Sequence, residues 1–415
     1  MKAIDYCVRV FDGTHDTPKP TEKGYKLITS KNILNRTLNL DDAYYISESD
    51  YISINKRSKV KQWDILFSMI GTVGNVYLEQ NKDITYAIKN MGVFSCEDEN
   101  KALWLYYYLQ SPYFKQYLNS YLSGAVQKFV PLDFLRNIEV PDCTEETIRK
   151  CSVLSTLDRK ISLNRSMNEE LERMAKEIYD YWFVQFEFPD ANGRPYKSSG
   201  GKMVYNPVLK REVPEGWEVK EVKDCIEPLQ RGVSYTSESI ENPNGYPMIN
   251  LACYTKQGDY RTGEMKYFTG EVKEVHKAYP YDMLIACTDM TQGADVIGRP
   301  ILATQEKEWF VYSMDLAKIV PATIEKMYLY YTLRTPFYHK YIKPFASGTT
   351  VKHLNTQGVE DYKIVIPCES VQLKFEAIIS NIKKEQMLLT NSSLELESLR
   401  DELLPLLMTG QVKIK

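Results

Sequence analysis

The chain repeats one segment at a fixed distance along its sequence. The string YYYLQSPYFKQY at residues 106–117 returns as YYTLRTPFYHKY at residues 330–341, and in both places a Ser-Gly pair and then a lysine follow. The offset is 224 residues (336 − 112) at three unlike pairs: Pro112 and Pro336, Gly124 and Gly348, Lys128 and Lys352. Because unlike residues that keep one offset over such a length indicate a duplicated structural unit, we expect two similar domains with two similar tasks.

The length and the charge of the chain agree with two domains that act through local surfaces. A chain of 415 residues is too long for one ordinary core, whereas halves of roughly 200 residues are usual for domains. The net charge is −3 and the pI is about 6.0. These values argue against a protein that coats nucleic acid by bulk charge. They allow local basic faces, because electrostatic steering depends on where the charges lie.

The cysteine, histidine and apolar residues limit which metal sites we expect and where in the cell we expect the protein. The sequence contains eight cysteines without a C-x-x-C pair, and only four histidines. Since tetrahedral zinc sites usually draw on such pairs, we expect no metal and no cofactor. No apolar run approaches the roughly 20 residues of a membrane span, and the N-terminus lacks the apolar core of a signal peptide. We therefore expect a cytoplasmic protein with reduced cysteines and no membrane partner.

Each half opens with short runs that are typical of strands. Aromatic and β-branched residues fill residues 25–30 and 63–68 in the first half and residues 246–251 and 281–286 in the second, with Gly, Asn and Asp between the runs. This pattern predicts the strands of a mixed sheet. A helical region follows in each half, and its Ser-Pro or Thr-Pro step lies where a helix should break.

Two long helices are predicted, one after each domain. Residues 145–183 contain no Gly or Pro, and apolar residues recur there at heptad spacing. The apolar rows are Leu154, Ile161, Ala175 and Trp182 with Leu157, Leu171 and Ile178, and then Phe375, Ile382, Leu389, Leu396 and Leu403 with Ile378, Leu399 and Leu406. Some 40 residues in each helix make rods of roughly 60 Å. Two such rods most simply bury their apolar seams against each other as a coiled coil.

Polar residues interrupt both predicted seams. Asn164 and Asn168 fall on the first seam, and Glu385 and Ser392 fall on the second. Buried polar residues at such positions lower stability but can fix the register of two helices. The sequence equally allows these side chains to face a partner or water.

Common catalytic motifs are missing from the sequence. It has no G-x-x-x-x-G-K-[ST] phosphate loop, no Asn-Pro-Pro-aromatic motif of an amino-methyltransferase and no G-x-S-x-G elbow. Asp190 with Glu218 and Lys220 could suggest a nuclease, but Asp190 lies in a Gly- and Pro-rich segment. His15 follows Asp-Gly-Thr and is best explained as a turn residue. We therefore predict no catalytic residue.

Three strings resemble the specificity subunit of type I restriction-modification systems. They are DGTHDTPKPTEKGYKLITSKNI at residues 12–33, LSTLDRKISLNRSMNEELERMAKEIYDYWFVQF at residues 154–186, and PYKSSGGKMVYNPVLKREVPEGWEV at residues 195–219. The resemblance spans nearly the whole chain. It implies an α+β fold in which two target-recognition domains, each a mixed sheet with helices, are separated by two long antiparallel helices with pseudo-twofold symmetry.

The resemblance also implies the division of the chain and its task. The recognition domains would be residues 1–143 and 214–367, the spacer helices residues 144–187 and 368–410, and the linker residues 188–213. Each domain would read one part of a split double-stranded DNA site. The helices would set the gap and dock two adenine-methylating subunits, and restriction subunits would join through the complex. The chain itself would have no catalytic activity, because the partner flips and methylates the base.

The two halves differ most in their middle segments. The first half has FSMIGTVG at residues 67–74, whereas the second has the longer ACTDMTQGAD at residues 286–295. We therefore expect an asymmetric target. Which bases are read does not follow from one sequence, because readout depends on side-chain geometry in the grooves and on DNA shape.

Candidate DNA contacts come from the repeated Ser-Gly-Lys motif and two further segments. Glycine lets the backbone approach DNA closely, lysine meets phosphate, and an amide or imidazole can reach a base edge. The candidates are Ser123, Gly124, Gln127 and Lys128, then Ser347, Gly348, Lys352 and His353, then the basic cluster Lys56, Arg57 and Lys59, and finally Gly71 and Thr72. A glycine turn with a solvated lysine is the competing explanation.

The aromatic end of the first long helix is a candidate for partner or domain docking. Its residues are Tyr179, Tyr181, Trp182 and Phe183. Two other classes of function stay open at this point, a duplicated scaffold without a DNA role and a self-contained enzyme. Binding to duplex DNA with two separated half-sites in the presence of the methylating partner would exclude the scaffold. Methyl transfer or cleavage by the isolated chain would favour the enzyme.

Overall fold

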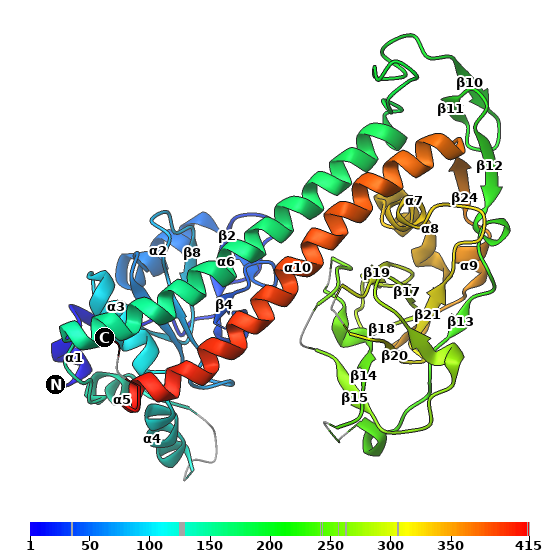
Figure 1. The fold of residues 1–415 in the computed structure, drawn as a ribbon. Coiled ribbons are helices and arrows are strands. Elements are labelled where there is room, and N and C mark those ends of the chain that lie inside the picture. Colours follow the sequence, from blue (N-terminus) through cyan, green and yellow to red (C-terminus); the bar gives the residue numbers. More distant parts are fainter. Residues whose placement is uncertain are drawn as a thin grey trace. The chain divides into compact units, whose positions relative to one another are not determined.

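The chain folds into two units that each combine sheets with parts of two long helices (Figure 1). This computed structural model describes residues 1–34, 36–123, 129–240, 242, 244–255, 257–261, 264–304, 307–412 and 414. Unit 1 contains Met1–Ile161 and Glu395–Lys415, and unit 2 contains Ser162–Leu394. The long helices are α6 (Glu145–Tyr179) and α10 (Glu369–Met408), and each has residues in both units.

Unit 1 contains two main sheets. The first is antiparallel, in the order β1 (Arg9–Asp12), β9 (Met91–Ser95), β6 (Asp64–Ser68) and β7 (Val76–Leu78). The second has the order β5 (Tyr44–Ile46), β2 (Tyr25–Ile28) and β8 (Tyr86–Ile88), with β2 parallel to β8. A small pair joins β3 (Ile33–Leu34) to β4 (Thr37–Leu38). The predicted mixed-sheet domain is confirmed.

The helices of unit 1 begin where capping residues allow. They are α1 (Ala3–Tyr6), α2 (Glu48–Ser58), α3 (Glu99–Tyr108), α4 (Pro112–Leu122) and α5 (Leu132–Asn137). The Ser111 hydroxyl accepts from the N–H of Phe114, and Pro112 follows as the first helical residue of α4. Proline suits that position because its missing N–H would have no partner there. The Ser-Pro step therefore ends one helix and starts the next, as predicted.

Unit 2 repeats this topology. Its antiparallel sheet has the order β13 (Gln230–Arg231), β21 (Leu316–Ile319), β17 (Met283–Ala286) and β19 (Pro300–Leu302). Its second sheet has the order β15 (Lys266–Phe268), β14 (Tyr246–Ile249), β20 (Phe310–Tyr312) and β16 (Lys277–Ala278), with β14 parallel to β20. The helices α7 (Lys326–Thr332), α8 (Pro336–Ile342) and α9 (Gln357–Glu360) follow in the same sequence as in unit 1.

The duplication extends to single backbone positions. A Cβ atom added to Gly13 would lie 2.5 Å from the Ile88 carbonyl oxygen, and one added to Gly232 would lie 2.2 Å from that of Tyr312. Both glycines therefore permit the same close approach of the chain to a central strand. Trp63 and Tyr281, just before β6 and β17, share φ values of 69° and 68°. The predicted internal repeat is confirmed at the level of the fold.

The segment predicted as a linker is folded. It contains the hairpin β10 (Met203–Asn206) and β11 (Arg211–Pro214). The buried Phe188 ring stacks on Tyr196 and Trp217, with ring centroids 4.5 and 4.9 Å apart. After the hairpin, β12 (Glu218–Glu221) pairs with β24 (Lys363–Ile366). The aromatic residues among the turn formers explain the difference, because they give the segment a small core of its own.

Short helical turns complete the fold. They are the 3-10 turns η1 (Ser30–Asn32), η3 (Val222–Asp224), η4 (Ser237–Ile240), η5 (Leu251–Cys253), η6 (Glu274–His276) and η7 (Lys343–Phe345), and the π-helical turn η2 (Asp180–Val184) that extends α6. Within the described residues, no helix is both long and apolar enough to cross a membrane.

The two long helices pair through polar contacts. In unit 2 the Asn164 Nδ2 donates to Ser392 Oγ at 3.3 Å. The Asn168 Nδ2 donates to Thr390 Oγ1 at 3.2 Å. Residue numbers rise along α6 as they fall along α10, so the helices are antiparallel. The prediction that Asn164, Asn168 and Ser392 lie on the seam is confirmed.

The predicted seam of α10 is partly wrong. Glu385 is exposed, and so are Ile378 and Leu399, at 39% and 45%. The buried face of α10 instead includes Ile379, Lys383, Ser393, Arg400, Leu404 and Leu407. Three of these six side chains are polar or charged. The heptad pattern predicted from apolar residues alone therefore selects a row of α10 side chains next to the row that is buried.

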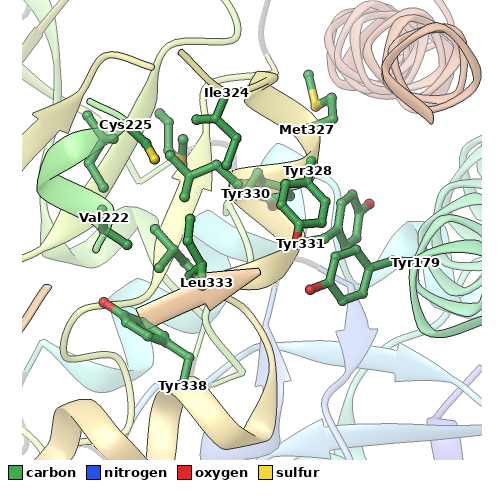
Figure 2. Packing of buried hydrophobic residues seen from close by; sticks show 14 of the residues in the cluster. Tyr179, Val222, Cys225, Ile324, Met327, Tyr328, Tyr330, Tyr331, Leu333 and Tyr338 are labelled. Carbon is green, nitrogen blue, oxygen red and sulfur yellow. The ribbon is translucent and has the colours of Figure 1, made fainter. Parts of the chain in front are cut away.

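Each sheet domain completes its core with residues from both long helices. In unit 1, Leu154 of α6 and Leu404 and Leu407 of α10 join the main core. In unit 2, Tyr179 lies beside Tyr328 and Tyr331 of α7, as Figure 2 shows. The Tyr179 hydroxyl donates to Thr332 Oγ1 at 3.0 Å. The domains and the helix ends are therefore packed as one core within each unit.

Candidate nucleic-acid interface

Three short strands in unit 2 bring the second Ser-Gly-Lys motif beside the divergent middle segment. The strand β18 (Thr288–Asp289) pairs with β23 (Lys352–Leu354), which in turn pairs with β22 (Ala346–Ser347). Asp289 lies opposite Lys352, and His353 lies between Thr288 and Ser347. The predicted Ser-Gly-Lys segment is thus paired with the start of the segment that differs between the two halves.

The turn between β22 and β23 requires its glycine. Gly348 has a φ of 119°, and a Cβ atom there would lie 2.1 Å from the Val351 carbonyl oxygen. Since L-residues rarely adopt this conformation, the glycine shapes the turn. The Lys352 Nζ donates to the Gly348 carbonyl oxygen at 3.4 Å, and the His353 side chain is exposed. The Lys352 side chain therefore folds back over the turn, and His353, as the next residue of β23, points to the opposite face of the strand.

A buried carboxylate organises the loop after β18. The Asp289 Oδ1 accepts from the N–H of Thr291 at 2.7 Å, and its Oδ2 accepts from the N–H of Val296 at 2.7 Å. The Met290 side chain, by contrast, is 74% exposed, and Gln292 is exposed as well. A thioether can contact a thymine methyl group, and an amide can pair with the adenine edge. The loop is thus held from inside and presents two side chains suited to base contact.

Unit 1 has the same pairing between the segment after its central strand and the residues that follow its Ser-Gly motif. Its segment after the central strand is shorter than the one in unit 2. Ile70 forms an antiparallel bridge with Phe129, and the N–H of Val130 donates to the Met69 carbonyl oxygen at 3.0 Å. The matched bond in unit 2 joins Leu354 N to the Cys287 carbonyl oxygen at 2.9 Å. Both halves therefore place the segment after the central strand beside the strand that follows the Ser-Gly motif.

The remaining predicted residues of unit 1 lie around this turn. Gly71 has a φ of 77°, and the Thr72 carbonyl oxygen accepts from Ser68 Oγ at 2.5 Å. Ser123 follows the end of α4 and donates through Oγ to the Ser120 carbonyl oxygen at 2.8 Å. Gly124, Gln127 and Lys128 lie outside the described residues.

The predicted basic cluster lies at the end of α2, beside the turn that carries His15. Lys56 and Lys59 are exposed. The Arg57 Nη2 donates to the Gly13 carbonyl oxygen at 3.1 Å and lies 3.7 Å from Asp12 Oδ1. The His15 ring nitrogens lie 2.9 Å from Asp12 Oδ2 and 2.9 Å from Asn90 Oδ1. Arg57 is thus tied to the turn, whereas the two lysines stay available to solvent.

The described residues contain no group of three or more His, Cys, Asp or Glu side chains placed to hold a metal ion. Burial raises the pKa of Asp64 to about 6, while the carboxylate accepts from the N–H of Lys61 at 2.8 Å. Asp64 is fully buried as the first residue of β6 and caps the turn that precedes this strand. The eight cysteines are all free.

Comparison with known proteins identifies the family. The sequence matches the family described as "Type I restriction modification DNA specificity domain" over residues 16–173 and 214–398, once in each half. The chain belongs to this family. The type I restriction enzyme MjaIX specificity subunit of Methanocaldococcus jannaschii is 25% identical over 316 residues, which cover 75% of this chain and 69% of the relative. The HindI specificity subunit of Haemophilus influenzae is 22% identical over 410 residues, covering 86% and 88%.

A solved structure shares the fold. The crystal structure of the S subunit of a type I restriction-modification system from M. genitalium has a TM-score of 0.52 at 14% identity, and the match covers 98% of this chain and 95% of that chain. The two-domain α+β fold expected for a specificity subunit is therefore confirmed.

The aromatic residues proposed for docking are mostly part of the core. Tyr179, Trp182 and Phe183 are buried in unit 2, where the Phe183 and Phe375 ring centroids are 4.9 Å apart. This burial in their own unit leaves them no surface for a partner subunit. Tyr181 alone among the four is exposed, at 41%, and its contact with a partner stays a prediction.

Sequence reasoning missed several residues of this surface. The divergent length of residues 286–295 marked the loop, but the exposure of Met290 and Gln292 depends on the internal contacts of Asp289. The interaction of Arg299 with His339, described below, was also missed. A signal existed in the repeat, because HKYIK at residues 339–343 is more basic than the matched KQYLN at residues 115–119.

Proposed function

We propose that this chain reads an asymmetric, bipartite site on double-stranded DNA, one part with each domain. The matched placement of the two reading segments carries this proposal. In each half, the segment after the central strand lies beside the strand that follows the Ser-Gly motif. Two such surfaces in one chain are expected to contact two stretches of one duplex, as the halves of dimeric DNA-binding proteins do.

The difference between the reading segments supports an asymmetric target. The first half presents a short turn with Gly71 and Thr72, whereas the second presents the longer loop with Met290 and Gln292. Different side chains make different hydrogen bonds and apolar contacts with base edges in the major groove. The two parts of the site should therefore differ in sequence.

The paired long helices are proposed to set the spacing between the two parts. Support comes from the polar pairs across the helices, because Asn164 with Ser392 and Asn168 with Thr390 favour one register. A fixed register would keep the distance between the readers constant. Changing the gap in the DNA by one base pair should then weaken binding by roughly tenfold or more, since each half-site must keep its groove position.

The long helices are also proposed to dock two methyltransferase subunits, through which restriction subunits join the complex. Apolar side chains stay exposed on these helices although both already pack against each other: Leu163, Met167, Met174, Leu373, Leu388 and Leu399. Apolar residues that remain in contact with water on a structured helix favour a further protein partner. Within this complex the chain would act in the cytoplasm and would itself be non-catalytic.

Mapping adenine methylation in host DNA tests this proposal. Methylation at one split sequence should disappear when the gene for this chain is removed and return when it is restored. A synthetic duplex with both mapped parts should bind the chain and methyltransferase together, whereas a duplex with one part should bind at least tenfold more weakly. Unchanged methylation without the chain, or methyl transfer by the isolated chain, would contradict the proposal.

A further inference from the structure

Unit 2 contains a cleft with a volume of about 720 Å³ and an excess of positive charge. The last turns of α6, the segment at residues 257–259 and the helix α8 line it. Its basic residues are Arg173, Lys176, Arg299, Arg334, Lys340 and Lys343. Its acidic residues are Glu172, Asp180 and Asp259. We call this feature the basic cleft.

Two of the carboxylates in the basic cleft are already engaged. Arg334 forms a close ion pair with Asp259 and lies 3.7 Å from Glu172. Glu172 also pairs with the buried Lys383. Although burial opposes its ionisation, Lys383 and Arg334 lower the pKa of Glu172. These carboxylates therefore balance Arg334 and Lys383, and Arg173 pairs with Glu170 and Glu177. The cleft cations without an ion pair among the described residues are Lys176, Arg299, Lys340 and Lys343.

Arg299 is a half-buried guanidinium with neutral acceptors. Its Nη1 donates to the Gln257 carbonyl oxygen at 2.9 Å and its Nη2 donates to His339 Nδ1 at 2.8 Å. Its Nε is buried without a hydrogen-bond partner among the described residues. Burial, Arg299 and Lys343 lower the pKa of His339 to about 4, so the ring is neutral at pH 7 and can accept a hydrogen bond from Arg299.

Three lysines add to this imbalance. Among the described parts of the chain, no ion pair involves Lys176, Lys340 or Lys343. Lys176 and Lys340 are exposed, and Lys343 is half-buried. Grouped positive charges without counter-charges repel one another. Binding of an anion between them would relieve this repulsion, and arginine matches the planar geometry of phosphate and carboxylate oxygens.

The basic residues that α8 and its neighbours contribute to the cleft are mostly not repeated in the first half. Under the offset of 224 residues, Arg334, Lys340 and Lys343 correspond to Gln110, Gln116 and Asn119. The fourth matched position, that of His339, has Lys115 in the first half. Lys115 is the only cation among these four positions of the first half. Two copies of one partner that dock on both halves would need similar surfaces there. The asymmetry therefore favours a ligand that meets only the second reader.

The floor of the cleft supports the reading loop. His339 Nε2 lies 3.3 Å from the Ala294 carbonyl oxygen, and with Nδ1 accepting from Arg299, it is Nε2 that carries the proton and donates. Ala294 belongs to the loop that Asp289 closes and that presents Met290 and Gln292. In DNA complexes, phosphate contacts flank the base contacts and fix the protein on the duplex. A cleft joined to a base-reading loop is well placed for this role.

We propose that the basic cleft binds a phosphodiester of the DNA backbone next to the second part of the target. This inference rests on the proposed DNA-reading function. Arg299 supplies the planar donor group, and Lys340 and Lys343 supply point charges beside it. Through His339 and Ala294, the bound phosphate would set the position of the reading loop on the bases.

The test compares the full chain with its Lys340→Gln/Lys343→Gln variant, each bound to its methyltransferase subunits. The probe is a duplex with the mapped target, titrated at salt concentrations from roughly 50 to 200 mM. We expect binding to weaken by about tenfold at the low end of the salt range, and the slope of log K against log salt to fall by about 0.9, the value for one lost phosphate contact. Ethylation of the phosphates beside the second part of the target should weaken binding by the wild-type chain. The same ethylation should not weaken binding by the variant.

Lys115→Gln, at the matched place on α4, provides the control and should leave slope and affinity unchanged. Equal thermal unfolding of all three proteins excludes a folding defect. If wild type binds the target and the double variant keeps the same affinity and slope, the cleft proposal fails while the proposed function stands. If the variant instead assembles poorly with the methyltransferase but binds DNA normally once assembled, the occupant is an acidic protein surface and the phosphate proposal is overturned. A wild-type complex that does not bind the target would contradict the proposed function itself.

Discussion

The Asp289 carboxylate accepts from the N–H of Val296, seven residues along the chain, at 2.7 Å. The same side chain also accepts from Thr291, and it is 1% exposed. One buried side chain therefore closes the loop that carries the exposed Met290. This bond ties the shape of a reading surface to the interior of its domain.

Replacing Asp289 should relax the reading of the second part of the target. Asp289→Ala leaves the N–H groups of Thr291 and Val296 without their partner, which costs about 1–3 kcal/mol for a buried donor. The loop should lose its fixed shape, and mapped methylation should spread to sites that vary in the second part only. Met290→Ala, which leaves the loop contacts intact, should change affinity without this loss of loop order. Equal relaxation of both parts would contradict this prediction.

The turn at Gly348 should not accept a side chain. In Gly348→Ala the new Cβ atom would meet the Val351 carbonyl oxygen at 2.1 Å, so the turn must shift in addition to adopting an unfavourable φ. Binding to the target should fall by about tenfold or more, measured with the methyltransferase present. Gly200→Ala is the control, because its φ is 90° and no atom lies within 4 Å of the added Cβ. Gly200→Ala has the same kind of unfavourable φ, but its new Cβ atom meets no other atom. Equal effects of Gly200→Ala and Gly348→Ala on DNA binding would contradict the prediction.

Lys383 should be important for the stability of the helix pair. It is 3% exposed and pairs with Glu172, so Lys383→Met leaves this carboxylate with Arg334, 3.7 Å away, as its charged partner among the described residues. Removing one partner of a buried pair typically costs about 3–5 kcal/mol, and the partial exposure of Glu172 places this case at the lower end. Urea unfolding at pH 7 measures the change. Lys384→Met, at the neighbouring exposed lysine, should change the free energy of unfolding by less than about 0.5 kcal/mol.

Asp64 predicts a dependence of stability on pH. Its pKa of about 6 in the folded protein is raised by burial above the ordinary value of 3.8, so the folded state binds its proton more tightly than the unfolded state. The stability from the protonated form is complete below pH 3.8 and is lost as pH rises through 6. Asp64→Asn should therefore be more stable than wild type at pH 8, by up to about 3 kcal/mol, and this gain should vanish near pH 4.

Urea unfolding of Asp64→Asn at several pH values checks this prediction. Asp282→Asn changes the matched carboxylate of unit 2, which accepts from the N–H of Tyr279 at 3.0 Å but is 26% exposed beside Lys318. It should show no comparable gain at pH 8. A gain for Asp64→Asn that is the same at pH 4 and pH 8 would show that the charge of the carboxylate is not the cause.

The repeat in the sequence predicted the larger part of the fold. Pro112 and Pro336 marked two equivalent helix starts, because the chemistry of a helix N-terminus is local and readable from a few residues. The long helices followed from the absence of Gly and Pro over residues 145–183. These features depend on neighbouring residues in the chain and need no knowledge of tertiary contacts.

Long-range contacts explain what the sequence did not predict. The seam of α10 was misplaced because Lys383 and Arg400 are buried by pairing with Glu172 and Asp158, which lie more than 200 residues away in the chain. For Trp182 and Phe183 the sequence left partner docking and domain docking open, because nothing nearby in the sequence shows that Phe375 covers them. The basic cleft was missed for the same reason, since Arg299 and His339 meet only in the folded unit.

The division of the chain has a consequence for its biosynthesis. The core of unit 1 includes Leu404 and Leu407, from the segment Glu395–Lys415, whereas unit 2 needs nothing beyond Leu394. The domain that leaves the ribosome first is therefore the last to acquire all of its core residues. Until Leu404 and Leu407 have been synthesised, unit 1 has an open apolar site that this later segment of the same polypeptide fills.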